Sequence, residues 1–326
     1  MIAYAGQAIL HATIAALVLE ALLRLWRVQD PGERLRLRWV VLLTPLLTAA
    51  YVVLVPARST DGFGVHWALF AGARWNALRV GPLGAASALT GLLIVLGVAL
   101  YLRDALPFLA DRTGRRTPEE ALPDAHPAVR RLHAQLGPAA GATAAPSVYV
   151  RVLDLDTPVL LCSGVDRPCI IASTSALDLL TDHELRAALA HELEHVAHRD
   201  PLSGWWLMAV RTLQCFNPAI QIVGRQAVVE IERRADLGAV GRGLGVPLAA
   251  AIARLGSASD TRSDLVDEDR PAASLPERVQ LTAHRHALDD RCERLLEARV
   301  PARSGLSPWH VGLAGAILSV VLFFVV

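Results

Sequence analysis

The chain has 326 residues, and 53% of them are hydrophobic. This content and a mean hydropathy of +0.38 exclude an ordinary soluble domain, while a net charge of +1 gives the chain as a whole no electrostatic attraction for nucleic acid. The four cysteines form no CxxC pair, which argues against a cysteine-ligated zinc site. Cys162 and Cys169 are candidates to face each other across a hairpin, although buried hydrophobic cysteines are the simpler interpretation.

Four apolar stretches are each long enough to cross a bilayer as a helix. The four predicted spans are residues 2–23, 39–57, 80–102 and 304–326. Polar side chains interrupt the first span, and we expect them to face other helices rather than lipid. The predicted organisation is therefore three transmembrane helices within residues 1–103, a domain at 104–303 and a C-terminal transmembrane helix.

Arginines predict the orientation of these spans. They are concentrated between the first and second spans and directly after the third. Because cytoplasmic loops carry an excess of basic residues, we expect both regions to be cytoplasmic, and the domain at 104–303 with them.

The domain is expected to begin with a connector rich in proline, glycine and alanine at residues 111–147, with one short helix near residues 128–136. Three short runs follow, SVYVRVLDLD, PVLLCSG and PCIIAS, and they are typical of strands in a small sheet. We expect a turn at residues 163–166 and an edge position at Pro168. The edge of this sheet either binds an extended peptide by strand addition or is an ordinary edge, and the sequence leaves both open.

The strongest motif is HELEH, which lies inside residues 182–200. Apolar positions in this segment recur at helical spacing, and residues i and i+4 of a helix share a face. His191 and His195 can therefore reach one ion, as the imidazole ligands of catalytic zinc do. Glu192 follows the first histidine, where it can take a proton from the water that zinc activates.

Two imidazoles leave such a site one protein ligand short. His198 shares their face, but it lies about 10 Å along the helix axis from His191, too far for zinc–nitrogen bonds of about 2.1 Å. A second helix at residues 226–240 offers Glu232 and Asp236 at i, i+4. We expect Glu232 to be the third ligand and Asp236 to accept a hydrogen bond that orients a ligand histidine. Without HELEH, the same helix would indicate only an exposed set of ion pairs.

The runs HELEHVAHRDPL, CFNPAI and EIERRADLGAV together resemble the BlaR/MecR-type membrane zinc metallopeptidases. These belong to the gluzincin group, which also includes the HtpX and CAAX-prenyl proteases. The family pattern of HExxH, Asn-Pro and an ExxxD helix corresponds here to His191–His195, Asn217-Pro218 and Glu232–Asp236. The resemblance covers residues 125–300 in detail. It implies an α-helical membrane protein with an inserted mainly-α, α+β gluzincin-type zinc metalloprotease domain.

Three further segments carry expectations. Residues 201–223 are predicted to form a pair of apolar helices interrupted at Arg211 and at Asn217-Pro218, and whether the pair enters the membrane is left open. Residues 256–276 are polar and acidic and predict a loop. Residues 277–299 predict a helix with a solvated face.

The predicted function is that of a membrane-embedded zinc-dependent endopeptidase, multi-pass in the cell membrane. By resemblance its substrate is a transcriptional repressor or another regulatory protein in signalling, and its partners are that protein, the lipid bilayer and a separate sensor protein, without direct nucleic-acid contact. A β-lactam-binding domain is not expected, because the chain contains no lysine for its Ser-x-x-Lys motif. Two alternatives stay open: a membrane quality-control protease, and a non-catalytic zinc-binding transducer or scaffold, against which Glu192 argues.

Overall fold

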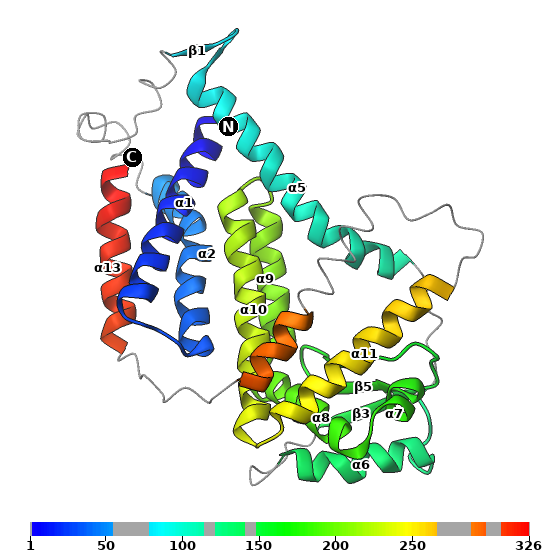
Figure 1. Cartoon of the computed structure of the whole chain (residues 1–326). Helices are drawn as coiled ribbons and strands as arrows, with labels where there is room; N and C mark the ends of the chain where they lie inside the picture. The colour runs from blue at the N-terminus through cyan, green and yellow to red at the C-terminus, as the bar shows by residue number, and fades with distance from the viewer. Residues whose placement is uncertain are drawn as a thin grey trace. The chain divides into compact units, whose positions relative to one another are not determined.

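A computed structural model describes residues 2–54, 78–113, 121–140, 148–265, 288–297 and 308–325. The chain is mainly helical (Figure 1). It divides into two compact units, of which unit 1 comprises Met1–Arg115, Trp205–Ile231 and Pro301–Val326, and unit 2 comprises Arg116–Gly204 and Glu232–Val300.

Unit 1 is built from long helices that pack through small and aliphatic side chains. Its helices are α1 (Ile2–Leu25), α2 (Pro31–Leu54), α5 (Ala85–Thr113), α9 (Asp200–Leu213) from Trp205 on, α10 (Pro218–Gly241) as far as Ile231, and α13 (Pro308–Val325). The core includes Leu19 and Leu23 of α1, Leu37 and Leu42 of α2, and Ile220 of α10. Segments far apart in the sequence are therefore held in one hydrophobic core.

Within the part of unit 1 that the structure describes, two helices are long and apolar enough to cross a membrane, α1 within Ala5–Leu25 and α5 within Ala85–Ala105. They coincide with the first and third predicted spans. The predicted spans at 39–57 and 304–326 overlap α2 and α13 in part, and residues 55–57, 304–307 and 326 lie outside the described residues.

The predicted start of the third span at residue 80 is wrong. Strand β1 (Arg79–Val80) pairs with β2 (Leu83–Gly84) through a tight turn in which Gly81 has a φ of +60°, a backbone conformation that glycine adopts without strain. Helix α5 begins only at Ala85 and continues to Thr113, well past the predicted end.

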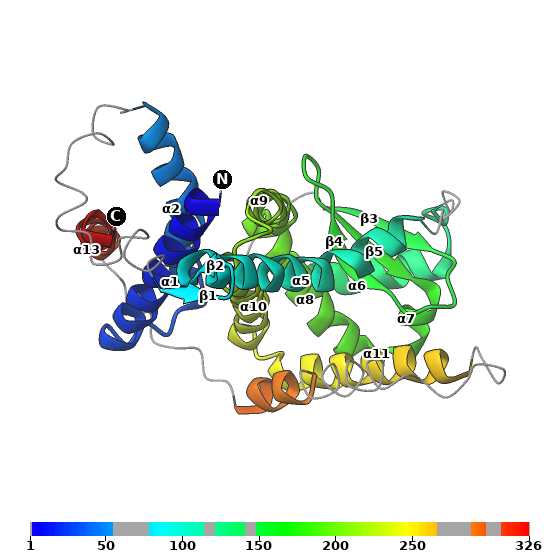
Figure 2. The ribbon, with the colours of Figure 1, turned by 90° about the horizontal axis from the view of Figure 1, so that it is seen from above.

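Unit 2 contains a small mixed sheet with helices packed around it. Its elements are α6 (Pro127–Ala140), β3 (Tyr149–Leu153), β4 (Leu160–Ser163), β5 (Cys169–Ser173), α7 (Thr174–Leu179), α8 (Asp182–His198), α11 (Gly245–Leu265) and a helix at 288–297. The strand order is β3-β5-β4, with β3 parallel and β4 antiparallel to β5 (Figure 2). The predicted short helix and the three predicted strands are confirmed.

Two details of the sheet differ from expectation. Pro168 directly precedes β5, which is the central strand rather than an edge strand. Cys162 pairs with Ile170, and Cys169 pairs with Ser163. Because consecutive residues of a strand point to opposite faces, the two cysteines lie on opposite faces of the sheet and do not face each other.

Two predicted interruptions of helices are also wrong. The first part of the predicted loop at 256–276 is helical as far as Leu265, and residues 266–276 lie outside the described residues. Leu255 packs against the core of unit 2, and the helix continues through Ser257, whose hydroxyl donates to the carbonyl of Ala253. Arg211 lies inside α9, because its guanidinium is paired. The predicted break at Asn217-Pro218 is confirmed, and α10 starts at this proline.

Candidate metal centre

Helix α8 positions the two histidines of HELEH. Thr181 caps the helix: its side-chain oxygen accepts from the amide of Glu184, and the Glu184 carboxylate accepts from the amide of Thr181. The apolar face of α8 is buried in the core of unit 2. His191 and His195 are buried one turn apart, with ring centroids 4.7 Å from each other.

Glu232 of α10 completes a triangle of possible ligand atoms with these histidines. The two Nε2 atoms are 3.1 Å apart, and the Glu232 carboxylate oxygens lie 3.6 Å from Nε2 of His191 and 3.7 Å from Nε2 of His195. Two ligands of a tetrahedral zinc ion with bonds of about 2.1 Å are about 3.4 Å apart. The spacing of all three pairs is therefore close to that of a zinc site.

Each histidine has a carboxylate next to its other ring nitrogen, and the contact is an aligned hydrogen bond for His195 but not for His191. Nδ1 of His195 lies 2.9 Å from Oδ2 of Asp200, and Nδ1 of His191 lies 3.0 Å from Oδ1 of Asp236. A carboxylate at Nδ1 favours the proton on that nitrogen and leaves the lone pair on Nε2. Both lone pairs then point toward each other, an arrangement that a cation between them relieves.

Asp200 was not among the predicted site residues. Arg199 ends α8 in the left-handed conformation, with a φ of 53°, and Asp200 starts α9 immediately after it. This sharp turn brings the Asp200 carboxylate back to His195, where it also pairs with Arg234 of α10. An acidic residue five positions after the second histidine of HELEH is the sequence signal from which this partner of His195 could have been predicted.

Arg291, on the helix at 288–297, is the second residue that the sequence reasoning missed. Its Nε and Nη2 donate to the two carboxylate oxygens of Asp236 at 3.0 and 2.7 Å. The same Nη2 lies 3.3 Å from Glu232 Oε2 and 3.3 Å from His191 Nε2. Residues 277–287, the first part of the helix predicted at 277–299, lie outside the described residues.

The charges around the histidines fit a divalent cation. Four carboxylates and two guanidinium groups surround the rings, those of Glu192, Asp200, Glu232, Asp236, Arg234 and Arg291. With neutral imidazoles this set carries a formal charge of −2, which one divalent ion balances. The donor set, its spacing and its charge all fit Zn²⁺.

Glu192 is buried next to the two ring systems and faces strand β4. Burial raises the pKa of its carboxyl, while His191 and His195 oppose that rise, as does a hydrogen bond from the backbone of Cys162. The Cys162 thiol is itself kept neutral, because burial and the Glu192 charge raise its pKa to about 12. A carboxylate with a raised pKa, held beside an ion site, is suited to proton transfer.

Without an ion, His191 keeps its additional proton to an unusually high pH. Burial alone would lower the pKa of His191, but Asp236 and Glu232 raise it to about 9. Burial likewise works against ionisation of Glu232 and Asp236, but His191 and Arg291 hold the pKa of both carboxyls below the ordinary value. The cluster therefore attracts a positive charge in either form, as a proton or as a metal ion.

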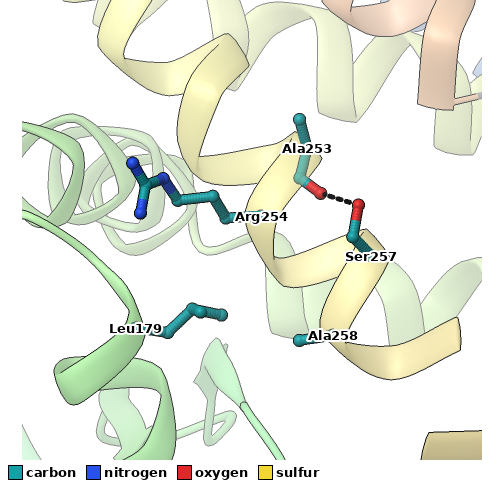
Figure 3. A pocket seen from close by; sticks show the side chains of 5 residues that line it. All are labelled: Leu179, Ala253, Arg254, Ser257 and Ala258. Atoms are coloured by element: carbon teal, nitrogen blue, oxygen red, sulfur yellow. Dashed lines mark hydrogen bonds between the residues drawn. The ribbon is translucent and has the colours of Figure 1, made fainter. Parts of the chain in front are cut away.

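A second feature of unit 2 is a shallow hollow between α7 and α11 (Figure 3). It is lined by Leu179, Ala253, Arg254, Ser257 and Ala258. Arg254 is its one charged lining residue, and this guanidinium is paired with Glu184 of the α8 cap. The hollow shares no residue with the His191 cluster and offers no comparable chemistry.

Comparison with known proteins places the cluster in a family context. Residues 91–242 match the model of a family described as BlaR1 peptidase M56. This segment includes α8, Glu232 and Asp236 but ends before Arg291. The resemblance to the BlaR/MecR and HtpX type of metallopeptidase is confirmed.

Curated relatives align over shorter stretches. The chain is 32% identical over 109 residues to Protease HtpX homolog 1 of Streptomyces coelicolor, a match that covers 33% of each chain. It is 39% identical over 85 residues to Protease HtpX of Legionella pneumophila subsp. pneumophila, covering 26% of this chain and 29% of the relative. Protease HtpX homolog of Polynucleobacter necessarius subsp. necessarius is 34% identical over 86 residues, 26% of this chain and 27% of the relative. The chain thus spans about a third or less of the length of these relatives, and no solved structure matches it.

Proposed function

From the match of residues 91–242 to the BlaR1 peptidase M56 family, we propose that this chain is a membrane-embedded, zinc-dependent endopeptidase. The observation that carries the proposal is the triangle of His191, His195 and Glu232, with its ligand spacing near that of tetrahedral zinc. These three side chains would hold the ion and leave one position open. Asp200 and Asp236 would fix the imidazole orientation.

Bound zinc would supply a Lewis acid that polarises the scissile carbonyl and acidifies a water molecule. Glu192 then accepts the proton of the attacking water and delivers it to the leaving amine. The buried position of Glu192 and its raised pKa support this role, because a carboxylate whose pKa is closer to neutrality is a stronger base toward water and its acid form can still protonate the leaving amine. A structural metal site has no need of such a group, which favours an enzyme over a scaffold.

We further propose that unit 1 lies in the cell membrane and that the protease domain is cytoplasmic. Two helices of membrane-spanning length and apolarity support the first part, and the exposed Arg24, Arg27 and Arg36 around the connection between α1 and α2 support the second. The substrate class that fits this placement is a cytoplasmic regulatory protein such as a transcriptional repressor.

The test is proteolysis by the purified, detergent-solubilised chain, read as self-cleavage and as cleavage of an unfolded casein-like protein. Wild type is compared with Glu192→Gln, with bound zinc measured in both. We expect equal zinc and a rate lower by about 10²–10⁴-fold in the variant, the usual contribution of a general base. Glu194→Gln is the matched control, because Glu194 lies on the same helix but pairs with Arg242 outside the cluster.

Each outcome of this comparison decides something. Zinc in both proteins with cleavage only by wild type and Glu194→Gln supports the proposal. Zinc without cleavage in any of them favours the scaffold, and absence of zinc from all of them refutes the assignment of the ligands.

A further inference from the structure

We propose that residues 205–231 form a re-entrant helical hairpin whose outer face contacts the acyl chains of a lipid bilayer. The hairpin consists of α9 from Trp205, a turn at residues 214–217, and α10 as far as Ile231. Figures 1 and 2 both show α9 and α10 side by side. This inference rests on the proposed membrane location of unit 1, and it assigns to the lipid phase a segment that would otherwise be part of the catalytic domain.

The two legs of the hairpin are too short to span a bilayer. The leg of α9 from Trp205 to Leu213 has nine residues and is about 14 Å long, and the leg of α10 from Pro218 to Ile231 has 14 residues and is about 21 Å long. The hydrocarbon core of a bilayer is about 30 Å thick. A hairpin of this size enters the membrane, turns inside it and returns to the side from which it came.

The surface of the hairpin has the polarity of a membrane protein. Most of its outward side chains are apolar, and Leu213 is 67% and Ile222 48% exposed. The other large exposed side chains of the segment are Trp205, Trp206, Val228 and Val229. Most of its polar residues are buried, namely Arg211, Gln214, Asn217, Gln221 and Glu230. Arg225 and Gln226 are half-buried, and the exposed Thr212 donates its hydroxyl to the carbonyl of Met208. In water this distribution would leave a large apolar area exposed, whereas in lipid it is the expected one.

The charged side chains of the hairpin all have ion-pair partners inside unit 1. The segment contains three of them, and all are ion-paired. Arg211 and Arg225 share the carboxylate of Asp104 on α5. Glu230 lies 2.6 Å from Arg34 of α2. No residue from 205 to 231 therefore presents an unpaired charge to the surroundings, as a low-dielectric environment requires.

Side chains also satisfy the irregular backbone of the turn. Gln221 donates its amide hydrogens to the carbonyls of Arg211 and Gln214. The Gln214 carbonyl also accepts from the amide of Asn217. Asn217 accepts from the amide of Ile220 and donates to the carbonyl of Ala8 in α1. Non-helical backbone at membrane depth is tolerated only where protein groups satisfy it in this way.

Contacts of the turn place it deep among the apolar helices. Asn217 reaches Ala8, which lies 12 residues before Glu20 on α1 and thus about 18 Å from it along the helix. Phe216 packs against Gly97, in the middle of the apolar stretch of α5. Two helices of spanning length thus place the turn within their apolar segments, with polar contacts at the other end of the hairpin.

Lipid is the occupant that the neighbouring surface favours over a second protein. Helix α5, which contacts the turn, exposes Leu92 and Val95, each at 66%. The outer face of the hairpin continues the apolar surface that the proposed span Ala85–Ala105 presents. Most exposed side chains of the hairpin are large and apolar, and only Ala209 and Thr212 among them are small residues of the kind that permits close helix–helix approach.

The test measures the surroundings of single nitroxide labels in the full chain. The four native cysteines are replaced by alanine, and one cysteine is introduced at Leu213, Ile222, Leu92 or Ser257. The labelled proteins are placed in phosphatidylcholine–phosphatidylglycerol vesicles, and collision with oxygen is compared with collision with a water-soluble nickel chelate. Leu92 on α5 is the lipid reference, and Ser257, exposed on α11 of unit 2, is the water reference.

We expect labels at 213 and 222 to show the oxygen-rich, nickel-poor profile of the label at 92, and the label at 257 to show the opposite. Labels at 213 and 222 that behave like the label at 257, with 92 still in lipid, overturn the hairpin but leave the proposed function intact. A water-accessible label at 92 refutes the membrane placement and the hairpin together. Labels at 213 and 222 that reach neither collider, but broaden each other's spectra between chains, identify a second copy as the occupant and refute lipid contact.

A measurement on the chain with its native cysteines guards against a cysteine-free variant that does not fold. Brominated phosphatidylcholine quenches tryptophans that touch its acyl chains. Replacement of Trp205 and Trp206 by phenylalanine should lower the quenchable fraction of the fluorescence from the seven tryptophans. An unchanged quenchable fraction would count against lipid contact at this face.

Discussion

Replacement of Asp200 by asparagine tests whether the carboxylates behind the histidines tune the metal site. In the structure, Oδ2 of Asp200 lies 2.9 Å from Nδ1 of His195, and the side chain is only 6% exposed. Asparagine keeps the size but removes the negative charge, and it leaves Arg234 without this ion-pair partner. Loss of a partner of this kind lowers metal affinity by about 10–100-fold, which corresponds to about 1.4–2.7 kcal/mol.

The assay is competition for zinc between the purified protein and a fluorescent chelator, which needs no proteolytic activity. Asp182→Asn is the matched control, because Asp182 also pairs with an arginine but is 59% exposed at the other end of α8. A surface pair contributes about 0.2–1 kcal/mol to stability and should leave zinc binding unchanged. If Asp200→Asn binds zinc as tightly as wild type, or if Asp182→Asn loses as much affinity, the assigned role of Asp200 is wrong.

Further predictions concern the same site and the hairpin. We expect Arg291→Lys to lower the free energy of unfolding by on the order of 1–3 kcal/mol, nearly as much as Arg291→Gln. The reason is that an ammonium group cannot bind both carboxylate oxygens of Asp236. If the lysine variant unfolds thermally like wild type, charge alone matters at this position. Because the pKa of His191 is raised from 6.5 to about 9, protonation of this side chain stabilises the folded, zinc-free protein. The stabilisation is complete below pH 6.5 and is lost as the pH rises through 9. The thermal midpoint of the zinc-free protein should therefore fall across this window while its apparent zinc affinity rises, and His191→Gln should abolish the fall. A Cβ at Gly97 would lie 2.5 Å from the carbonyl group of Phe216, whereas one at Gly91 meets nothing within 4 Å. Gly97→Ala should therefore lower the free energy of unfolding in detergent by about 1–3 kcal/mol, and an equal effect of Gly91→Ala would refute the contact.

The residues that sequence spacing could predict are those related by the helical repeat. His191 and His195, and likewise Glu232 and Asp236, are separated by one turn of a helix, and the structure brings both pairs together. Which residues would support them was harder to infer. Arg291 is 55 positions from Asp236, and no local pattern relates them.

The errors in the fold have a similar origin, since they arise where tertiary contacts override local composition. Arg211 was expected to interrupt a helix, but its pairing with Asp104 lets α9 continue through it. The polar stretch after Gly256 was expected to be a loop, but Leu255 anchors it to the core and α11 continues to Leu265. Composition alone does not reveal the partner that makes a polar or charged residue compatible with a helix.

The single left-handed residue between α8 and α9 has a consequence for how this gene can vary. Arg199 is the only residue between the two helices, and it sets the distance from His195 to Asp200. A codon inserted or deleted here would rotate Asp200 by about 100° about the axis of its helix and carry its carboxylate away from the imidazole. Replacement of Arg199 by glycine or asparagine keeps the left-handed conformation accessible. Among natural variants of this segment we therefore expect changes of residue type at this position and a constant number of residues.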